Sequence, residues 1–158
     1  MVHKPLPEDK CLEILAKASV GRLGMCVGDE PYVVPLTYVW HEGKVVFHCA
    51  TSGRKLEMLA ANPRVCFQVD DESFVLPGAK ACNFTVHYYS AMIAGEAHLV
   101  ADAAARLAAI RALVAKYDPA GRAPVLNDSD LEGQEFLVYE IVPQSISGVD
   151  HARPRPSS

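Results

Sequence analysis

Three apolar runs separated by two short turns make up residues 22–50, which read RLGMCVGDEPYVVPLTYVWHEGKVVFHCA. The runs Arg22–Val27, Tyr32–Trp40 and Lys44–Ala50 are rich in Val, Tyr, Phe and Leu, most of which favour strands. Their connectors, Gly28-Asp29-Glu30 and His41-Glu42-Gly43, carry residues typical of hairpin turns. This segment therefore predicts three antiparallel strands in a meander.

Helices are expected on both sides of this segment. Pro7 suits a first helical turn, and the acids that follow it face the positive end of the helix dipole. Apolar residues then recur at helical spacing, which predicts an amphipathic helix over residues 7–18. Beyond the third strand, Arg54–Asn62 has a shorter apolar face and is predicted to form a second helix that ends at Pro63.

The second half of the chain alternates extended and helical patterns. Arg64–Val69 predicts a fourth strand, Asp70–Cys82 a loop, and Asn83–Val100 a long extended stretch with a bulge or bend at Gly95. A helix capped by Asp102 is expected to run to Tyr117, followed by a polar connection up to Asp130 and a last strand over Phe136–Val142.

Hairpin-connected strands with inserted helices favour one architecture. Without βαβ alternation, the pattern predicts a mainly β fold, a largely antiparallel barrel with helices at its ends, and argues against a Rossmann fold. Neither GxGxxG nor GxxxxGK[ST] occurs, so nucleotide binding by those loops is not supported. We expect one domain over residues 1–148 and a disordered Pro/Arg/Ser-rich tail over residues 149–158.

Composition narrows the class of protein. The chain has 158 residues, is 50% hydrophobic and 22% charged, and carries a net charge of −4, unlike a typical nucleic-acid binder. With no long apolar run and no signal peptide, we expect a cytoplasmic protein that binds neither membrane nor nucleic acid. The five cysteines are scattered and away from the histidines, so we expect core thiols and no metal site.

The segment Phe47-His48-Cys49-Ala50-Thr51-Ser52-Gly53-Arg54-Lys55 carries the strongest chemical signal. Arg54 and Lys55 stand at a helix start, where the dipole is already positive, so an anion there would offset an unfavourable placement. Free backbone N–H groups and the hydroxyls of Thr51 and Ser52 complete a plausible phosphate cradle. A solvated Arg-Lys pair beside an ordinary turn is the alternative.

The order of motifs over residues 7–148 resembles the pyridoxamine 5′-phosphate oxidase-related flavoproteins, most of all their nitroimidazole-reductase branch. The resemblance is carried by the Gly-Arg-Leu strand from Gly21, the Pro-Tyr-Val-Val-Pro strand from Pro31, and Phe47-His48 followed by Gly53-Arg54-Lys55. Further matches are Asn62-Pro63-Arg64-Val65-Cys66-Phe67, Phe84-Thr85, Tyr88-Tyr89-Ser90 and Ile146-Ser147-Gly148.

The resemblance implies a split β-barrel that forms a homodimer with FMN bound at the subunit interface. On matching positions, Arg54 and Lys55 would grip the FMN phosphate together with Thr51. The family also implies that the isoalloxazine ring lies along a strand that offers backbone hydrogen bonds to its polar edge, here Val34, Pro35, Leu36 and Thr37. Tyr88 and Ser90 would reach in from the partner subunit, and Tyr89 between them could stack on the ring or line the substrate pocket. Tyr89 stands where the family usually has Arg, which removes one cationic contact.

His48 is the candidate catalytic residue, because the nitroimidazole-reducing branch gives a site role to a histidine at the matching strand end. A neutral imidazole could donate a hydrogen bond or relay a proton, and a strand-end histidine bonded to backbone is the alternative. His87, His98 and Trp40 are more simply explained as structural or rim residues.

Three functions from different classes follow, of which the third is a structural dimerisation module whose site is vacant. The first is an FMN-dependent oxidoreductase that reduces a small organic acceptor, for example a nitro compound, with electrons from a reduced nicotinamide or another donor. The second is a flavin- or haem-binding carrier or sensor without turnover, with His48 or His87 as an axial ligand. Exposed edges of a partly open barrel also favour dimerisation, with Arg64–Val69 and Asn83–Val100 as the expected interface strands.

Overall fold

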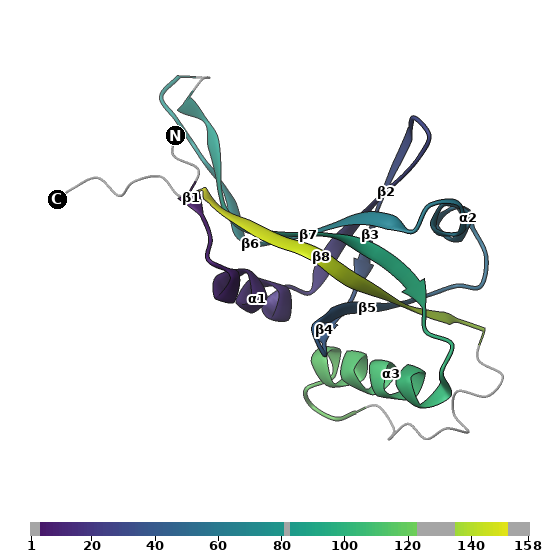
Figure 1. The fold of residues 1–158 in the computed structure, drawn as a ribbon. Coiled ribbons are helices and arrows are strands. Elements are labelled where there is room, and N and C mark those ends of the chain that lie inside the picture. The colour runs from purple at the N-terminus through teal and green to yellow at the C-terminus, as the bar shows by residue number, and fades with distance from the viewer. Residues whose placement is uncertain (1–3, 81–82, 123–134, 152–158) are drawn as a thin grey trace.

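The computed structural model describes residues 4–80, 83–122 and 135–151, and in this part of the chain one eight-stranded sheet is combined with three helices (Figure 1). The elements in chain order are β1 (Lys4–Pro5), α1 (Glu8–Lys17), β2 (Val20–Val27), β3 (Glu30–Thr37), β4 (Val39–His41), β5 (Lys44–Cys49), α2 (Arg54–Ala61), β6 (Arg64–Leu76), β7 (Thr85–Leu99), α3 (Ala103–Tyr117) and β8 (Leu137–His151). The mainly β fold and the three predicted helices are confirmed.

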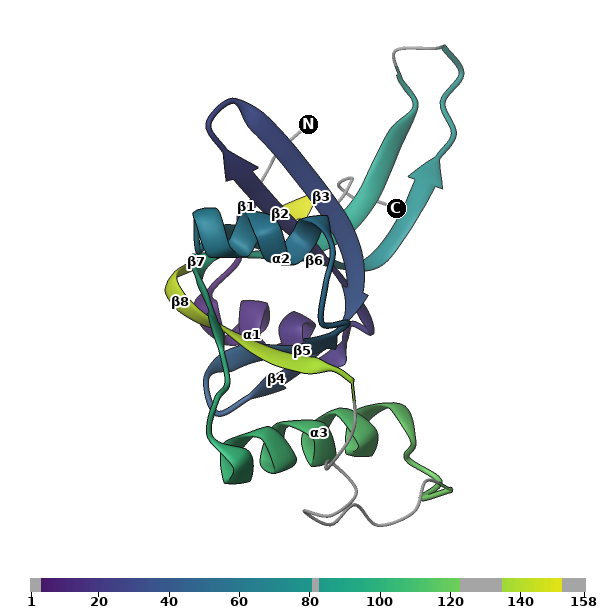
Figure 2. The same cartoon turned by 90° about the vertical axis from the view of Figure 1, so that its right-hand side faces the viewer.

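The sheet is antiparallel and has the strand order β3-β2-β6-β7-β8-β5-β4, with β1 paired to β8. The sheet curls on itself (Figures 1 and 2). Because of this curl, β4 and β5 lie on the side of the molecule opposite to the outer face of β2. The predicted meander is wrong. β2 pairs with β3 and β6, whereas β4 and β5 form a separate hairpin joined to the sheet through β8.

A break at Tyr38 explains why the meander does not form. The run Tyr32–Trp40 was expected to be one strand, but β3 ends at Thr37 and β4 begins at Val39. The Tyr38 side chain is fully buried, and its hydroxyl donates a 2.6 Å hydrogen bond to the Leu15 carbonyl oxygen. The chain therefore turns at Tyr38 from one side of the curled sheet to the other.

Two strands are longer than their sequences predict. The stretch Asp70–Cys82 was expected to be a loop, yet β6 continues through Leu76, with a register irregularity between Asp71 and Phe74. β7 supplies the backbone hydrogen-bond partners that this polar stretch lacks on its own. The far parts of β6 and β7 form an arm that projects from the body (Figures 1 and 2).

The last strand also extends beyond Phe136–Val142. β8 reaches His151 because it pairs along β7, from Leu99 opposite Tyr139 to Tyr88 opposite His151. The domain boundary expected after residue 148 thus falls inside a strand, and residues 152–158 lie outside the described part of the chain. The irregularity expected at Gly95 is confirmed by a register shift between Ala94 and Gly95. A Cβ at Gly95 would collide with the Val142 carbonyl oxygen.

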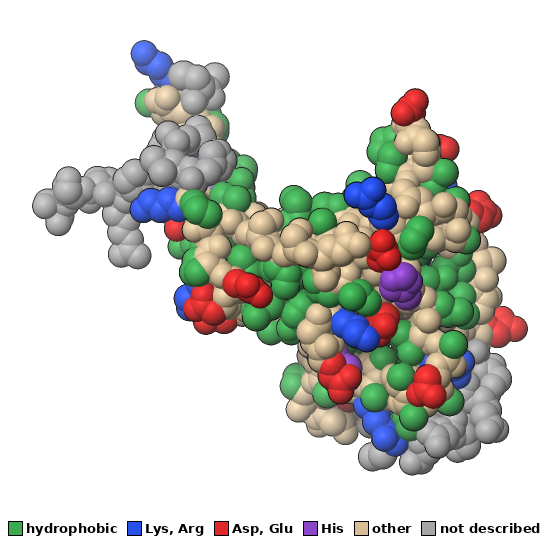
Figure 3. Space-filling view, in the orientation of Figure 1, with side chains coloured by type: hydrophobic (Ala, Val, Ile, Leu, Met, Phe, Trp, Pro, Cys, Tyr) green, Lys and Arg blue, Asp and Glu red, His purple; other side chains and the backbone are tan. Residues whose placement is uncertain are grey.

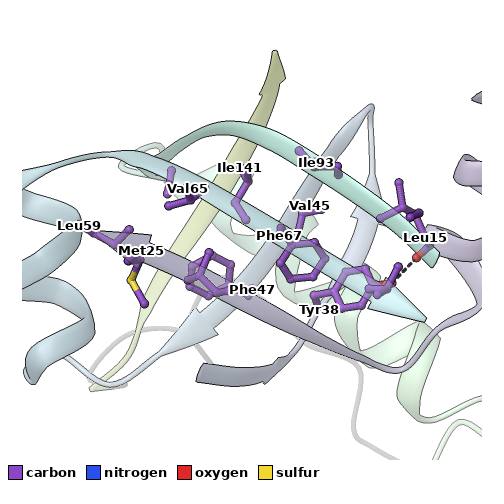
Figure 4. Close-up of a cluster of buried hydrophobic side chains, with 14 of the residues drawn as sticks. Leu15, Met25, Tyr38, Val45, Phe47, Leu59, Val65, Phe67, Ile93 and Ile141 are labelled. Carbon is purple, nitrogen blue, oxygen red and sulfur yellow. Dashed lines mark hydrogen bonds between the residues drawn. The ribbon is translucent and has the colours of Figure 1, made fainter. Parts of the chain in front are cut away.

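The main core lies inside the curl of the sheet (Figure 4). Its largest fully buried side chains include Tyr38, Phe47 and Phe67, and the rings of Tyr38 and Phe67 meet edge to face at 4.8 Å. α1 closes one end of this core with its buried face, and α2 contributes Met58 and Leu59. The buried face of α1 is the one that the helical periodicity predicted, whereas on α2 Leu59 is buried as predicted, Leu56 is half-buried and Ala60 is exposed.

α3 packs outside the curl, against β4 and β5, where it builds a second, smaller core. Its N-cap is the predicted Asp102, whose carboxylate accepts a 2.8 Å hydrogen bond from the Ala105 N–H. Leu113 and Ala109 of the helix meet Val46 and Val138 of the sheet in this cluster. α3 therefore covers a face of the sheet that the main core does not use.

The cysteines are divided between interior and surface. Cys11 and Cys49 are buried, as expected for core thiols, whereas Cys26 and Cys66 are exposed because they occupy the outer faces of β2 and β6. Cys82 lies outside the described residues. Within the described residues, no three His, Cys, Asp or Glu side chains are grouped as a metal site would require. In the same residues, every helix is too short or too polar to cross a membrane.

Candidate functional site

The turn between β5 and α2 is open to solvent and leaves the start of α2 uncapped. Gly53 adopts φ of 120°, a left-handed value that side-chain-bearing residues rarely take, and it directs the chain into the helix. No side chain caps α2, and Thr51 and Ser52 are exposed next to it. The first N–H groups of an α-helix have no partner within the helix, so this end can receive an anion.

The two cations predicted at this turn are both present but have different surroundings. The Arg54 guanidinium lies 4.5 Å from the centre of the Tyr32 ring and forms an ion pair with Glu30, which links α2 to the start of β3. Lys55 lies closer to the core, with its ammonium 5.4 Å from the centre of the Phe47 ring. Arg54 therefore borders β3, whereas Lys55 borders β5.

Lys55 also influences the end of β5. Burial raises the pKa of the Cys49 thiol, and the positive charge of Lys55 acts on that pKa in the opposite direction. The ammonium thus lies near the strand end that His48 and Cys49 form. An anion placed between α2 and this strand end would meet Lys55 on one side and uncapped helix N–H groups on another.

β3 is an edge strand, so one side of its backbone has no neighbouring strand within the described sheet. Val34 and Leu36 turn their side chains toward the core, whereas Pro35 and Thr37 are exposed. Proline is tolerated in an edge strand where its missing N–H would face away from the sheet. Residues two positions apart on a strand direct their backbone groups to the same side, so Pro31, Pro35 and Thr37 all face the same way. The Thr37 N–H and the carbonyls of Pro35 and Thr37 therefore face the open side of β3.

That geometry divides the four residues expected to line a flavin ring. Val34 and Leu36 alternate with Pro35 and Thr37, so their backbone groups face β2 and their side chains contribute to the core. Only Pro35 and Thr37 combine exposed side chains with backbone groups at the open edge. The backbone hydrogen bonds expected of all four residues are available from these two.

His48 and Thr37 line the same cavity, which has a volume of about 540 Å³. The His48 side chain is exposed at the end of β5, and its ring meets the Phe136 ring edge to face at 6.2 Å. Phe136 also lines the cavity, and the rest of the described wall comes from α3, through the residues Ile110, Leu113, Val114 and Tyr117. Of the residues predicted from sequence, the structure brings His48 and Thr37 to one cavity, and the helical wall was not foreseen.

The missed residues left a partial signal in the sequence. Ile110, Leu113 and Val114 follow the helical apolar period, which indicates a packed face without telling whether it covers a core or a cavity. Tyr117 ends the helix, and nothing in its sequence neighbourhood links it to Thr37. Phe136 lies in the run that was expected only to form a strand.

Tyr117 links the α3 wall of the cavity by hydrogen bonds to Tyr38, the residue between β3 and β4. Its hydroxyl oxygen accepts a hydrogen bond from the Tyr38 N–H at 2.9 Å and lies 2.6 Å from the Ser19 carbonyl oxygen. The neighbouring Lys116 ammonium donates to the Ala18 carbonyl oxygen at 2.6 Å and sits 4.0 Å from the centre of the Tyr38 ring. Burial lowers the pKa of Lys116 to about 8. Both polar groups are therefore bound to residues outside the described lining of the cavity.

The aromatic motif on β7 lies elsewhere in this chain. The Tyr88 ring contacts the His151 ring at 4.9 Å, and Tyr89 lines a second cavity of about 450 Å³ beside α1. Ser90 pairs with Asp70 at the base of the arm. Figure 1 shows α2 at the opposite end of the molecule from this arm. A single chain thus does not bring these three residues to Arg54, Lys55 and His48.

The other histidines singled out in the sequence have local partners. His87 is partly buried between Phe74 and Tyr89, with ring-centre distances of 4.8 and 5.3 Å. His98 is exposed, and its Nε2 lies 3.5 Å from a Glu96 carboxylate oxygen. Neither lines the cavity at His48, and both surroundings agree with rim or structural roles.

Comparisons with known proteins agree with this fold. A family model described as pyridoxamine 5′-phosphate oxidase matches residues 7–150. An uncharacterized protein of Rhizobium meliloti (strain 1021) is 30% identical over 69 residues, which are 44% of this chain and only 45% of that protein. The match thus spans less than half the length of this curated relative.

Solved structures with the same fold include three informative neighbours. A candidate 5-nitroimidazole antibiotic resistance protein from Bacteroides thetaiotaomicron is 19% identical, with a TM-score of 0.75 and coverage of 94% of this chain and 89% of that one. An FAD-binding protein from Mesorhizobium loti is 24% identical, with a TM-score of 0.69 and coverage of 96% and 100%. An FAD and heme binding protein from Mycobacterium smegmatis is 14% identical, with a TM-score of 0.77 and coverage of 98% and 76%. These likenesses confirm the predicted split-barrel fold.

Proposed function

Because the chain belongs to the pyridoxamine 5′-phosphate oxidase family, we propose that it is an FMN-dependent oxidoreductase. It reduces a small organic acceptor, for example a nitro compound, with electrons from a reduced nicotinamide or another donor. Its free thiols Cys11, Cys26, Cys49 and Cys66 suit a reducing compartment, so we place it in the cytoplasm.

One observation carries this proposal. An uncapped helix start with two cations borders an edge strand whose backbone is open, and that strand ends at a cavity with a histidine. From Tyr32, beneath Arg54, to Thr37, at the cavity, β3 extends about 16 Å. An elongated molecule with a phosphate at one end and a planar polar ring at the other matches this sequence of features.

The residues present fit FMN. Arg54, Lys55 and Thr51 would hold the phosphate at the start of α2, where the helix dipole and N–H groups also favour negative charge. The open backbone groups of Pro35 and Thr37 would bind the polar edge of the ring, while Val34 and Leu36 support the strand from the core side. The flavin supplies the electron-transfer chemistry when it is bound.

His48 is the proposed catalytic residue because it is the one histidine in the described wall of the cavity, and the other ionisable side chain there, Tyr117, has its hydroxyl bonded to backbone groups. One of its ring nitrogens would donate a hydrogen bond to the acceptor and pass a proton to it, while the other ring nitrogen takes up a proton from solvent. We expect His48→Gln to lower kcat about a hundredfold while leaving FMN affinity unchanged. The matched control is His98→Gln, which changes an exposed histidine away from the cavity. Turnover by His48→Gln at the control's rate would contradict the assignment.

Residues on β7 are proposed to reach the flavin of a second subunit. Tyr88, Tyr89 and Ser90 lie far from α2 within one chain, so they can serve this site only from a partner copy. Because Tyr89 replaces the family's usual arginine, the contact it makes would be stacking or lining of the substrate pocket. We therefore propose a homodimer with shared flavin sites.

Oxidation of pyridoxamine 5′-phosphate itself is a less suitable activity. A phosphorylated substrate needs a second set of cations, and the described wall of the cavity at His48 contains no lysine or arginine. The basic residues Arg153 and Arg155 of the C-terminal segment lie outside the described residues. Turnover of pyridoxamine 5′-phosphate at the rate of a dedicated oxidase would overturn this conclusion.

Flavin titration of two charge-matched variants tests the cofactor site. Arg54→Ala with Lys55→Ala should weaken FMN binding at least about a hundredfold, because each charged hydrogen bond contributes roughly 1.5–3 kcal/mol. Lys44→Ala with Arg64→Ala removes the same charge from positions outside the site and should bind FMN like the unchanged protein. Equal FMN affinity in both variants would contradict the phosphate assignment. A parallel FAD titration tests the choice of FMN.

A flavin- or haem-binding carrier or sensor without turnover is the second candidate. It is favoured by the exposed His48 beside a largely apolar cavity and by the neighbour from Mycobacterium smegmatis that binds FAD and heme. The absorption spectrum of the purified protein separates the two. A flavin spectrum that bleaches with reduced nicotinamide without air supports the oxidoreductase, whereas a Soret band supports a haem protein.

A further inference from the structure

The cavity between α3 and the end of β5 has apolar side chains on one wall and hydrogen-bonding side chains on the other. Four of its described lining residues come from one helix, namely Ile110, Leu113, Val114 and Tyr117, and Phe136 adds an aromatic edge. The Tyr117 hydroxyl is bonded to backbone groups, so the polar side chains left in the described lining are Thr37 and His48, which lie at the ends of β3 and β5. One wall is thus apolar and belongs to α3, while the other can form hydrogen bonds.

The Lys116 ammonium, next to the α3 wall, is bound to residues outside the described lining of this cavity. Lys116 lies next to Tyr117 in sequence, but its ammonium binds the Ala18 carbonyl oxygen and stacks on the Tyr38 ring. The Tyr117 hydroxyl lies among backbone groups of Ser19 and Tyr38. Transfer of a carboxylate or phosphate into a pocket without a compensating cation is unfavourable. The described wall therefore disfavours anionic ligands.

We propose that this cavity is the acceptor pocket and that it selects uncharged, largely apolar ring compounds with one hydrogen-bond acceptor directed at His48 and Thr37. The proposal rests on the proposed function, because the ring of a flavin bound along β3 would end beside Thr37. A volume of about 540 Å³ lies within the range of small-molecule sites, roughly 300–1,000 Å³. α3 is then the element that sets acceptor size and polarity.

Val114 offers a direct way to narrow the pocket. It lies in the cavity wall and is only partly buried, so a larger side chain there extends into the cavity. The next residue, Ala115, is exposed and lies outside the wall, which makes Ala115→Phe a matched control for Val114→Phe. Ile110→Phe narrows the same wall from one turn away and replaces Val114→Phe should that variant fail to fold.

The test compares two probes of similar shape and different charge, 4-nitrobenzyl alcohol and 4-nitrobenzoate. Calorimetric titrations use the flavin-free and the FMN-loaded protein, so probe binding and flavin binding are measured separately. We expect the alcohol to bind at least tenfold more tightly than the benzoate in both forms. Val114→Phe should weaken alcohol binding at least tenfold, with FMN affinity unchanged, while Ala115→Phe binds like the unchanged protein.

Each other outcome has a defined meaning. Equal affinity for the two probes, equal affinity in Val114→Phe and Ala115→Phe, or no binding of the alcohol would overturn the pocket assignment, even where FMN binds normally. Binding of the alcohol as expected by a protein that takes up no FMN would overturn the proposed function. The cavity would then remain a binding site for neutral ring compounds, without the role of an acceptor pocket.

Discussion

Tyr38, which lies between β3 and β4, contacts both α1 and α3. Its hydroxyl donates to Leu15 on α1, its N–H donates to the Tyr117 hydroxyl, and its ring carries the Lys116 ammonium. Removing a partner from a buried polar group leaves it unsatisfied, at a cost of about 1–3 kcal/mol. The position that interrupts the strand is thus also the one that holds α1 and α3 in place.

Lys116 makes stability depend on pH in a defined window. Burial lowers its pKa from 10.5 to about 8 in the folded chain, so between about pH 8 and pH 10.5 the unfolded chain binds more protons. Stability attributable to Lys116 therefore rises with pH through this window. Lys116→Met removes the titrating group. Between about pH 7 and pH 10, the thermal unfolding midpoint of the unchanged protein should therefore rise relative to that of the variant.

The half-buried Lys44 provides the control for this measurement. Lys44→Met also removes a lysine, from a solvent-accessible ion pair with Glu140. Its unfolding midpoint should follow that of the unchanged protein in parallel over the same pH range. Parallel profiles for Lys116→Met as well would show that the ammonium of Lys116 titrates like a solvated lysine.

At the scale of elements, the arm formed by β6 and β7 exposes apolar side chains. Phe74 is 51% exposed, Val75 65%, Phe84 54% and Val86 40%. Figure 3 shows further hydrophobic side chains on the face of the body between this arm and the β2–β3 hairpin. Apolar surface gathered on a projecting element marks an interaction site.

The arm should therefore contribute to the proposed homodimer. Phe74→Ser with Val75→Ser should weaken the dimer about a hundredfold, since two buried apolar side chains contribute roughly 3 kcal/mol. Leu99→Ser changes a residue that is 50% exposed at the other end of β7 and should leave the dimer intact. Sedimentation over a range of protein concentrations measures the dissociation constant. A flavin-loaded protein that stays monomeric would remove both the dimer and the shared site.

The elements differ in how far their sequences predict them. α1, α2 and α3 were predictable because each carries a helical apolar period and recognisable ends, such as Asp102 before α3. The outer half of β6 was not, because Asp70 and Asp71 have no strand preference of their own. Pairing with β7 makes that segment a strand, and no local pattern reports a partner 20 residues away.

For the molecule as a whole, the strand order and the composition of the site were the unpredictable parts. The short connectors favoured a meander, but the buried position of Tyr38 separates β3 from β4. Residues that share a motif, such as Arg54 and Lys55, were found from sequence because their neighbours are local. The wall from α3 depends on long-range packing, which places Val114 opposite His48 although 66 residues separate them.

The two prolines of β3 have a consequence for the chain before it has bound anything. A strand that keeps one side open for a ligand also offers that side to other strands, and such edges promote aggregation. Pro31 and Pro35 remove donors that an incoming strand would need, while the N–H of Thr37 stays available at the end. The same edge can thus bind a small molecule, while the missing proline N–H groups disfavour strand pairing between newly made chains.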